Sequence, residues 1–409
     1  MTMKRDTFLK LSLSVCSILI CLIIGEIGVR FIGTYDLDGN ISVRSLDLKP
    51  YRLPVVGVKK RVEAYLAAAA ESVNLYEYDS TLGWIQRPNS QSEDGRYYHN
   101  SMRIRTLPSV EYSILPQNDT LRIAIFGDSY SYGSQVPFEN TWGYYLEDNL
   151  TKAGIDVEVM NFGAGAYGMD QAFLRWKKVG YKFHPHLVIF GLQMENVKRN
   201  VNLIRPLYAH STKTPLAKPR FILNGGGLEL INIPVVPPEQ VPYILENFEA
   251  WEFAEYETFY RPENYQDNFW LQSKLVSFTL AAISREDTES YFYDLNEEPA
   301  QLTLRIIQEF RHDVEENGGK FLIVHLPTQY HLADILKDGK LRYSEMLDKM
   351  DEDHEVIHPE QNLLEEAENV SLDALFTKRH YAANANKVIA DAITKYVMPT
   401  EGEMALDYE

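Results

Sequence analysis

The sequence predicts an α/β protein with a mostly parallel sheet in three layers, and two observations lead to this prediction. Short apolar runs at residues 121–126, 157–162 and 187–191 have the profile of buried parallel strands. Helical stretches at 141–153 and 171–179 separate these runs. Strands that alternate with helices at this spacing form βαβ units, so we expect helices on both faces of one parallel sheet.

This alternation is interrupted between residues 200 and 298 and then resumes. Within the interruption, residues 221–231 predict a hairpin, because the glycines at their centre permit the positive φ of a tight turn. The interrupted stretch is therefore expected to be an insertion in the α/β domain. Beyond it we expect a helix, a strand and a last helix, at 302–316, 321–326 and about 382–397.

The N-terminus has the properties of a membrane anchor. Residues 8–25 are apolar except for Lys10, and their length is close to what a bilayer span requires. Lys4, Arg5 and Lys10 precede or begin this run, so the positive-inside rule places the N-terminus in the cytoplasm and the remainder outside it. No small-x-small cleavage site follows, which favours a retained anchor over a cleaved signal peptide. We expect the anchor at residues 1–33 and a neck or extension at 34–118. The α/β domain is expected at 119–400, with the insertion at about 200–298.

Composition excludes some functions. The formal net charge is −18 and the isoelectric point is about 5.1, which argues against nucleic-acid binding because phosphates require clustered Lys and Arg. The two cysteines, Cys16 and Cys21, both lie in the apolar N-terminal run. The rest of the chain therefore has neither a disulfide framework nor a thiol nucleophile.

Gly127-Asp128-Ser129 follows the first expected strand directly. Ligands of parallel sheets bind beyond the carboxyl ends of the strands, so this serine stands where chemistry usually occurs. A serine hydroxyl becomes a good nucleophile only when a neighbouring base takes its proton. Alone, the tripeptide fits a helix-capping serine equally well. Other segments of the chain are needed to choose between these readings.

Four segments, taken in order, resemble the SGNH or GDSL-type hydrolase family. They span about residues 121–397, and the last of them begins at His380. The membrane-anchored subgroup of this family is also similar upstream, in the apolar N-terminus and in Leu82-Gly83-Trp84. The four segments are 125–133, 161–171, 192–197 and 380–386.

The resemblance implies a serine mechanism that needs no cofactor. Ser129 is expected to attack an ester carbonyl while His380 removes its proton, which gives a covalent acyl-enzyme. The oxyanion that develops is expected to accept hydrogen bonds from the backbone N–H groups of Ser129 and Gly163 and from the Asn196 side chain. Two further residues are expected to shape the turn at the site: Gly127 and Asp128.

Two features depart from the family pattern. Family members usually place an aspartate two or three residues before the histidine, but those positions hold Lys378 and Thr377 here. Asp373, seven residues before His380, is one candidate for the orienting acid, and a Ser–His dyad without an acid is the other. The third segment is also altered, so the asparagine assigned as Asn196 is open to a shift in register.

The function implied is that of a serine esterase or O-acyltransferase. Its substrate is expected to be an acyl ester of an extracytoplasmic glycan or of a small molecule. The expected acyl group is acetyl. The expected partners are the membrane, through the N-terminal helix, and proteins that modify envelope polysaccharides. A non-catalytic carbohydrate-binding or scaffold protein on the same fold stays open, because a fold does not fix a function.

One motif favours different chemistry. His354-Glu355-Val356-Ile357-His358 matches the H-E-x-x-H pattern of zinc hydrolases. That pattern binds zinc only on a helix, where residues four apart share a face. Pro359 follows at once and two β-branched residues lie inside the motif, so a short strand or loop is expected here. Zinc hydrolysis is therefore the less favoured alternative, and no metal is expected.

Overall fold

The computed structural model describes residues 5–44, 46–116, 120–210, 212–283 and 288–398. The expected boundary between residues 118 and 119, the expected domain end at residue 400 and the side chain of Lys4 lie outside these residues.

A five-stranded parallel sheet forms the centre of the molecule, as the alternation of strands and helices predicts. Its order is β14-β13-β10-β8-β9, which is 2-1-3-4-5 when these strands are counted from the end where β9 lies. The chain passes from β8 to β9 on one side and returns to β10 on the other. The gap between β8 and β10 is thus the topological switch point, where ligands of open α/β sheets bind. The strands are β8 (Leu121–Gly127), β9 (Val157–Asn161), β10 (Leu187–Leu192), β13 (Lys320–His325) and β14 (Val356–Ile357).

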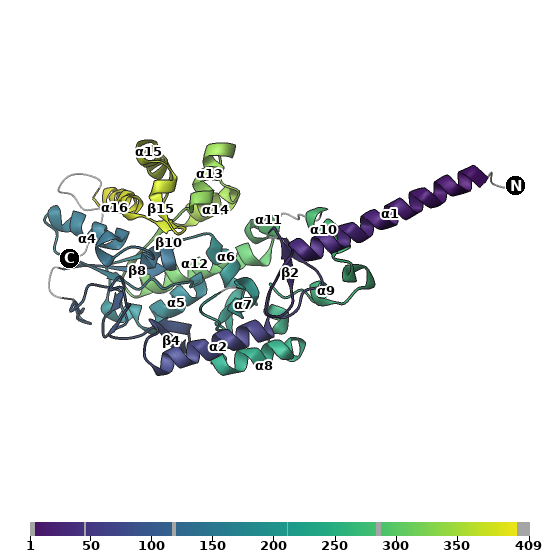
Figure 1. The fold of residues 1–409 in the computed structure, drawn as a ribbon. Coiled ribbons are helices and arrows are strands. Elements are labelled where there is room, and N and C mark those ends of the chain that lie inside the picture. The colour runs from purple at the N-terminus through teal and green to yellow at the C-terminus, as the bar shows by residue number, and fades with distance from the viewer. Residues whose placement is uncertain (1–4, 45, 117–119, 211, 284–287, 399–409) are drawn as a thin grey trace.

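Helices cover both faces of this sheet, which confirms the three-layer α/β prediction (Figure 1). Along β8, Ile123 and Ile125 face one apolar cluster, whereas Ala124 and Phe126 face the other, because side chains alternate along a strand. The first face is covered by α4 (Trp142–Lys152) and α16 (Ala383–Val397), and the second by α5 (Met169–Lys178) and α12 (Glu298–Glu316). At its carboxyl edge the sheet is followed by α3 (Ser129–Tyr132), α6 (Glu195–Asn200) and α13 (Gln329–Asp338).

Part of the expected neck is built into this domain. The Gln86 side chain donates a hydrogen bond to the carbonyl of Gly163 at 2.7 Å, and the Trp84 indole donates one to the carbonyl of Gly165 at 3.0 Å. Both side chains are fully buried. This segment therefore helps to shape the loop after β9 and is not a separate neck. The elements of the 34–118 region are β1 (Thr34–Tyr35), β2 (Ile41–Val43), β3 (Leu46–Leu48), α2 (Val55–Ala70), β4 (Tyr76–Asp79), β5 (Gly83–Gln86), β6 (Ser90–Gln91) and β7 (Tyr98–His99).

The insertion between residues 200 and 298 contains the expected hairpin, with β11 (Arg220–Asn224) antiparallel to β12 (Gly227–Ile231). The remainder of the insertion is a set of short helices. These are α7 (Arg205–Tyr208), α8 (Val241–Glu246), α9 (Pro262–Tyr265), α10 (Lys274–Ile283) and α11 (Thr288–Tyr293).

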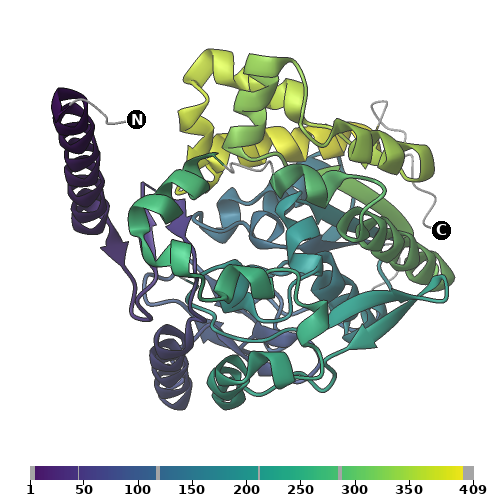
Figure 2. The same cartoon turned by 90° about the vertical axis from the view of Figure 1, so that its right-hand side faces the viewer.

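The N-terminal helix α1 (Arg5–Ile32) extends away from the body of the molecule (Figures 1 and 2). Residues Thr7–Ile32 have a mean hydropathy of 2.3 in their most apolar window, none of which is buried, so the helix is long and apolar enough to span a membrane. Its last turns are integrated into the fold: Glu26 accepts hydrogen bonds from the backbone N–H groups of Lys274 and Leu275 at 3.0 and 2.9 Å.

The C-terminal region brings the last expected segment to the sheet. Before α16, the two-residue strands β15 (Phe376–Thr377) and β16 (His380–Tyr381) pair antiparallel. Tyr381 anchors this small hairpin, because its buried hydroxyl donates a hydrogen bond to the carbonyl of Pro327, beyond the carboxyl end of β13, at 2.7 Å. The other helices of this region are α14 (Ser344–Asp353) and α15 (Glu360–Val370).

Candidate active site

The turn after β8 requires the glycine that the sequence places there. Gly127 has a φ of +145°, and a Cβ at this position would lie 2.7 Å from the carbonyl oxygen of Gly191 on the neighbouring strand. A side chain would therefore push β8 and β10 apart. Asp128 follows, fully buried, and caps α3 by accepting a hydrogen bond from the N–H of Tyr130 at 2.8 Å. These two residues present Ser129 at the switch point.

Ser129 and His380 come together there, although they are 251 residues apart in the chain. Nε2 of His380 lies 2.9 Å from Oγ of Ser129. Ser129 opens α3 and is half-buried, while His380 opens β16 beside it. An imidazole nitrogen at this distance can take the hydroxyl proton as the oxygen attacks an electrophile. The two residues therefore have the geometry of a nucleophile and its general base.

A backbone carbonyl orients the His380 ring. Nδ1 lies 3.3 Å from the carbonyl oxygen of Lys378. A carbonyl can only accept, so Nδ1 carries the hydrogen and Nε2 is left with its lone pair toward Ser129. Lys378 and Arg379 both have positive φ, at +47° and +71°, which turns the chain sharply enough for this contact. The ring also packs against Tyr130, with centroids 5.0 Å apart.

Asp373 does not orient His380 in this structure. Its carboxylate accepts a hydrogen bond from the side-chain amide of Gln329 at 2.5 Å, on the exposed side of the turn before β15. Within the described residues, no carboxylate is hydrogen-bonded to the His380 ring. Of the two alternatives left open by the sequence, the structure has the arrangement of a dyad with a carbonyl in the place of the acid.

The environment of His380 favours the neutral imidazole that a base requires. Burial lowers the pKa of His380 below its ordinary value of 6.5, and the positive charge of Arg199 lowers it further. The carboxylate of Asp128 and the Lys378 carbonyl act in the opposite direction without reversing the shift. These effects shift His380 toward its neutral form, which is the form a general base requires.

This shift leads to a prediction for the pH dependence. A base is active only when unprotonated, so kcat/KM falls as pH drops through the pKa of His380 in the free enzyme. We expect the acid limb of the kcat/KM profile to have its midpoint below pH 6.5, with a plateau from there to pH 8. A midpoint above pH 6.5 for hydrolysis of an uncharged ester would contradict the assignment of His380.

Gly163 lies near the site but not in the expected role. Its N–H already donates a hydrogen bond to Oδ1 of Asn161 at 2.9 Å, and it does not line the cavity that Ser129 opens into. A Cβ at Gly163 would lie 2.5 Å from the backbone nitrogen of Tyr132. Glycine is therefore required here for close packing against α3, and the prediction that its N–H binds an oxyanion is not supported.

Ala166, three residues further along this loop, has the features expected of the backbone donor. It lines the cavity and has a φ of +66°, and in the part of the chain that the structure describes its N–H has no hydrogen-bond acceptor. The N–H of Ser129, as the first residue of a helix, also has no intrahelical partner. These two groups are the candidate backbone donors for an oxyanion. Sequence reasoning missed Ala166 because a positive φ is normally signalled by glycine.

Asn196 is likewise a structural residue. It is almost fully buried, its amide donates to the carbonyl of Gln193 at 2.7 Å, and its carbonyl oxygen accepts from Arg199 at 3.3 Å. Gln193, at the end of β10, lines the cavity instead. Its Oε1 accepts from the N–H of Glu195 at 2.7 Å, which leaves its NH₂ group as a donor for the cavity. Gln193, three residues before Asn196, is therefore the candidate for the side-chain donor that the sequence assigned to Asn196.

Replacing Gln193 by alanine tests this assignment. Removal of one side-chain donor from an oxyanion site lowers kcat by about 10²- to 10³-fold in enzymes where it has been measured. We expect Gln193→Ala to lower kcat for a small acetyl ester to this degree while KM changes little, because the donor acts on charge that develops in the transition state. An unchanged kcat would remove Gln193 from the oxyanion site.

The cavity around Ser129 has a volume of about 860 Å³ and holds both charged and aromatic side chains. Strand β4 contributes Tyr76, the loop after β9 contributes Ala166, and β16 contributes His380. A volume of this size suits a sugar unit or a small ester. The extension, the sheet and the C-terminal hairpin therefore build one site together.

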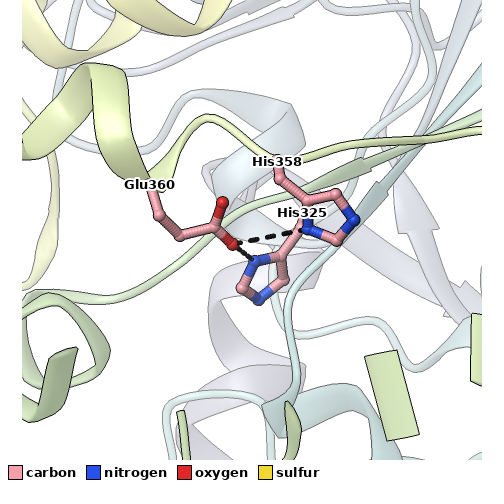
Figure 3. Close-up of side chains that lie close together, drawn as sticks. All are labelled: His325, His358 and Glu360. Atoms are coloured by element: carbon pink, nitrogen blue, oxygen red, sulfur yellow. Dashed lines mark hydrogen bonds and ion pairs between the residues drawn. The ribbon is translucent and has the colours of Figure 1, made fainter. Parts of the chain in front are cut away.

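The H-E-x-x-H segment is not helical. His354 follows the end of α14, and residues Val356–Ile357 form the edge strand β14. His358 instead lies beside Glu360 and the buried His325, as Figure 3 shows. The zinc arrangement predicted by the motif is therefore absent from this segment of the structure.

His325, His358 and Glu360 could hold a metal ion by proximity, since their ligand atoms lie within 4.8 Å of one another. The same groups form a closed hydrogen-bonded cluster. Nδ1 of His325 contacts Glu360, and Nε2 of His358 contacts Asp351 at 2.8 Å. Although burial disfavours the charge on Glu360, the two histidines lower its pKa to about 2, and Glu360 and Asp351 raise that of His358 to about 9. An ion-paired cluster accounts for these contacts without a metal.

No protein-family model matches the chain, and no curated protein matches it. Several solved structures are similar at low identity. The lipase Lip_vut3 from a goat rumen metagenome is 8% identical, with a TM-score of 0.40 over 70% of this chain and 100% of that chain. A mutant of an acetyl-xylooligosaccharide esterase from Geobacillus Stearmophilus is 8% identical, with a TM-score of 0.38 over 71% and 97%.

A member of the lipolytic protein G-D-S-L family from Veillonella parvula is 9% identical, with a TM-score of 0.33 over 67% of this chain and 97% of that chain. Every one of these TM-scores is below 0.5, so these similarities are not used to infer an activity. The proposed activity is inferred instead from the geometry of Ser129, His380 and their surroundings.

Proposed function

We propose that this protein is a serine esterase or O-acyltransferase that acts through an acyl-enzyme on Ser129. The observation that carries the proposal is the 2.9 Å contact between Oγ of Ser129 and Nε2 of His380 at the switch point of a parallel sheet. The four sequence segments that resemble SGNH hydrolases support it, since they supply the residues and loops of this site. The substrate we propose is an acyl ester, preferably acetyl, of a glycan outside the cytoplasm.

In the proposed reaction, Oγ of Ser129 attacks the ester carbonyl and its proton passes to Nε2 of His380. The oxyanion accepts hydrogen bonds from the N–H groups of Ser129 and Ala166 and from the Gln193 amide. The alcohol leaves with the proton from His380, and the acyl group stays on Ser129. Water or a sugar hydroxyl then attacks the acyl group and gives its proton to His380, and His380 returns a proton to Oγ of Ser129 as the acyl–oxygen bond breaks, which restores the starting state.

We further propose that α1 is a retained anchor that holds the site at the outer face of a membrane. Its exposed apolar surface suits a bilayer, and its last turns have specific partners in the folded domain. Glu26 caps the start of α10, and Val29 is only 6% exposed. A cleaved signal peptide would have no need of such contacts.

Hydrolysis of a chromogenic acetyl ester by the full-length protein in detergent tests the proposed function. We expect turnover that survives a metal chelator, because the serine mechanism needs no metal. Addition of an acetylated oligosaccharide together with an unacetylated acceptor separates the esterase from the transferase by whether acetate or the acetylated acceptor accumulates. Loss of turnover with chelator, restored by Zn²⁺, would favour a metal at His325, His358 and Glu360 instead.

A further inference from the structure

We propose that the glycan ester bound at Ser129 carries a negatively charged group close to the ester. This inference names the substrate class of the same site and therefore rests on the proposed function. It comes from the charges that line the cavity.

The cavity differs in charge from the rest of the chain. Among the described residues that line it, six are Lys or Arg and three are Asp or Glu. The whole chain has the opposite balance, with 40 Lys and Arg against 58 Asp and Glu. An excess of cations in a cleft of an acidic protein concentrates anionic ligands there, because the low-dielectric walls focus the field.

Half of these cations already have carboxylate partners. Lys198 pairs with Glu289 at 2.7 Å, and Arg342 pairs with Glu289 at 2.9 Å. Arg199 pairs with the buried Asp128 at 2.8 Å. These three pairs hold α3, α6 and α11 in place around the cavity and leave little positive charge for a ligand.

The other three cations are Arg205, Lys213 and Arg379, and none has an ion-pair partner among the described residues. Only one carboxylate of the lining, Glu195, is also without an ion pair there. The unpaired charge of the cavity is therefore positive, and an anion is the ligand that would balance it.

Arg205 is the best placed of the three. Its Nε donates to Oγ1 of Thr212 at 2.9 Å, and its guanidinium lies 5.9 Å from the centre of the Trp84 ring. One Nη lies 3.5 Å from the carbonyl of Ala166, the residue whose N–H is the proposed oxyanion donor. These neutral contacts position the guanidinium without neutralising it. Burial and the charge of Arg199 lower the pKa of Arg205 to about 9, although the carboxylates of Glu195 and Asp128 act in the opposite direction.

Arg379 approaches the same space from the C-terminal hairpin. It immediately precedes His380, its side chain is exposed, and its carbonyl is held by the Tyr130 hydroxyl. One unpaired cation thus adjoins the oxyanion donor Ala166 and another adjoins the base His380. An acidic group within one sugar unit of the ester would lie near both. A uronate carboxylate and a sugar phosphate share this chemistry.

The test compares three acetylated sugars as substrates of the full-length enzyme in detergent: methyl glucoside, methyl glucuronide and methyl glucoside 6-phosphate, each with one acetyl ester. We expect kcat/KM to be about 10- to 100-fold higher for at least one anionic sugar than for the neutral one, as charge-assisted hydrogen bonds imply. The carboxylate and phosphate arms show which anion is preferred. The preference should shrink as ionic strength rises, because the interaction is electrostatic.

Two variants link this preference to the cations. Arg205→Gln and Arg379→Gln are each expected to lower the ratio of anionic to neutral kcat/KM by about tenfold. Arg379 is exposed, so its variant remains informative if the partly buried Arg205 is needed for folding. Lys182→Gln, an exposed lysine at the amino edge of the sheet, is the matched control and should leave the ratio unchanged.

The outcomes separate this inference from the proposed function. Equal kcat/KM for neutral and anionic sugars, in an enzyme that hydrolyses a chromogenic ester through Ser129, would overturn the inference and leave the serine mechanism standing. A preference that both arginine variants retain would also overturn it. An enzyme inactive on every ester would contradict the proposed function itself.

Discussion

The Ser129→Ala protein is expected to lose essentially all hydrolysis of a chromogenic acetyl ester, with kcat lowered by about 10⁴- to 10⁶-fold. Oγ of Ser129 is the atom that Nε2 of His380 contacts, so its removal leaves the proposed base without a nucleophile to activate. Residual turnover would come only from the oxyanion donors. Stopped assays of the purified variant, corrected for spontaneous hydrolysis, measure the loss.

Ser134→Ala is the matched control, since Ser134 lies in the same segment just after α3 and is also half-buried. We expect it to keep the activity of the unmodified protein. A Ser129→Ala protein that keeps more than about a tenth of the activity, while remaining folded by circular dichroism, would refute Ser129 as the nucleophile.

His380→Ala is expected to lower kcat by about 10⁴-fold or more, nearly as much as the loss of Ser129, because nucleophile and base act as one unit. The double variant should therefore be little worse than either single variant. Comparing the three proteins with the same ester gives the coupling between the two residues.

Asp373→Asn provides the contrast to His380→Ala. The carboxylate of Asp373 accepts a hydrogen bond from Gln329 and does not contact His380, so we expect the variant to have activity within about threefold of the unmodified protein. A drop as large as that of a lost triad acid, about 10⁴-fold, would restore Asp373 as the orienting acid. It would mean that the C-terminal hairpin rearranges when substrate binds.

The fold could be predicted from the sequence because the signals were local. The apolar runs at 121–126 and 187–191 are long enough for buried strands, and helices of ordinary length separate them. The structure contains both strands, as β8 and β10, and each extends one residue beyond its predicted range. The extension at 34–118 gave no such signal, and its contribution to the site through Trp84 and Gln86 depends on contacts made far along the chain.

The site could be predicted only in part, for a related reason. Ser129 and His380 are identified by residue type and position, and the structure brings them together. Which backbone or amide N–H is free for an oxyanion depends on tertiary hydrogen bonds instead. The N–H of Gly163 already donates to Asn161, and the Asn196 side chain is hydrogen-bonded to Gln193 and Arg199. No periodicity or motif reports such partners.

The most direct test of the serine mechanism is to trap the acyl-enzyme. The full-length protein is mixed with an activated acetyl ester, quenched in acid within the first turnover and digested for peptide mass spectrometry. We predict one added acetyl group on the peptide that contains Ser129, and its absence from the Ser129→Ala and His380→Ala proteins. Rapid hydrolysis with no acetylated peptide, or acetyl on a different residue that His380→Ala does not affect, would contradict it.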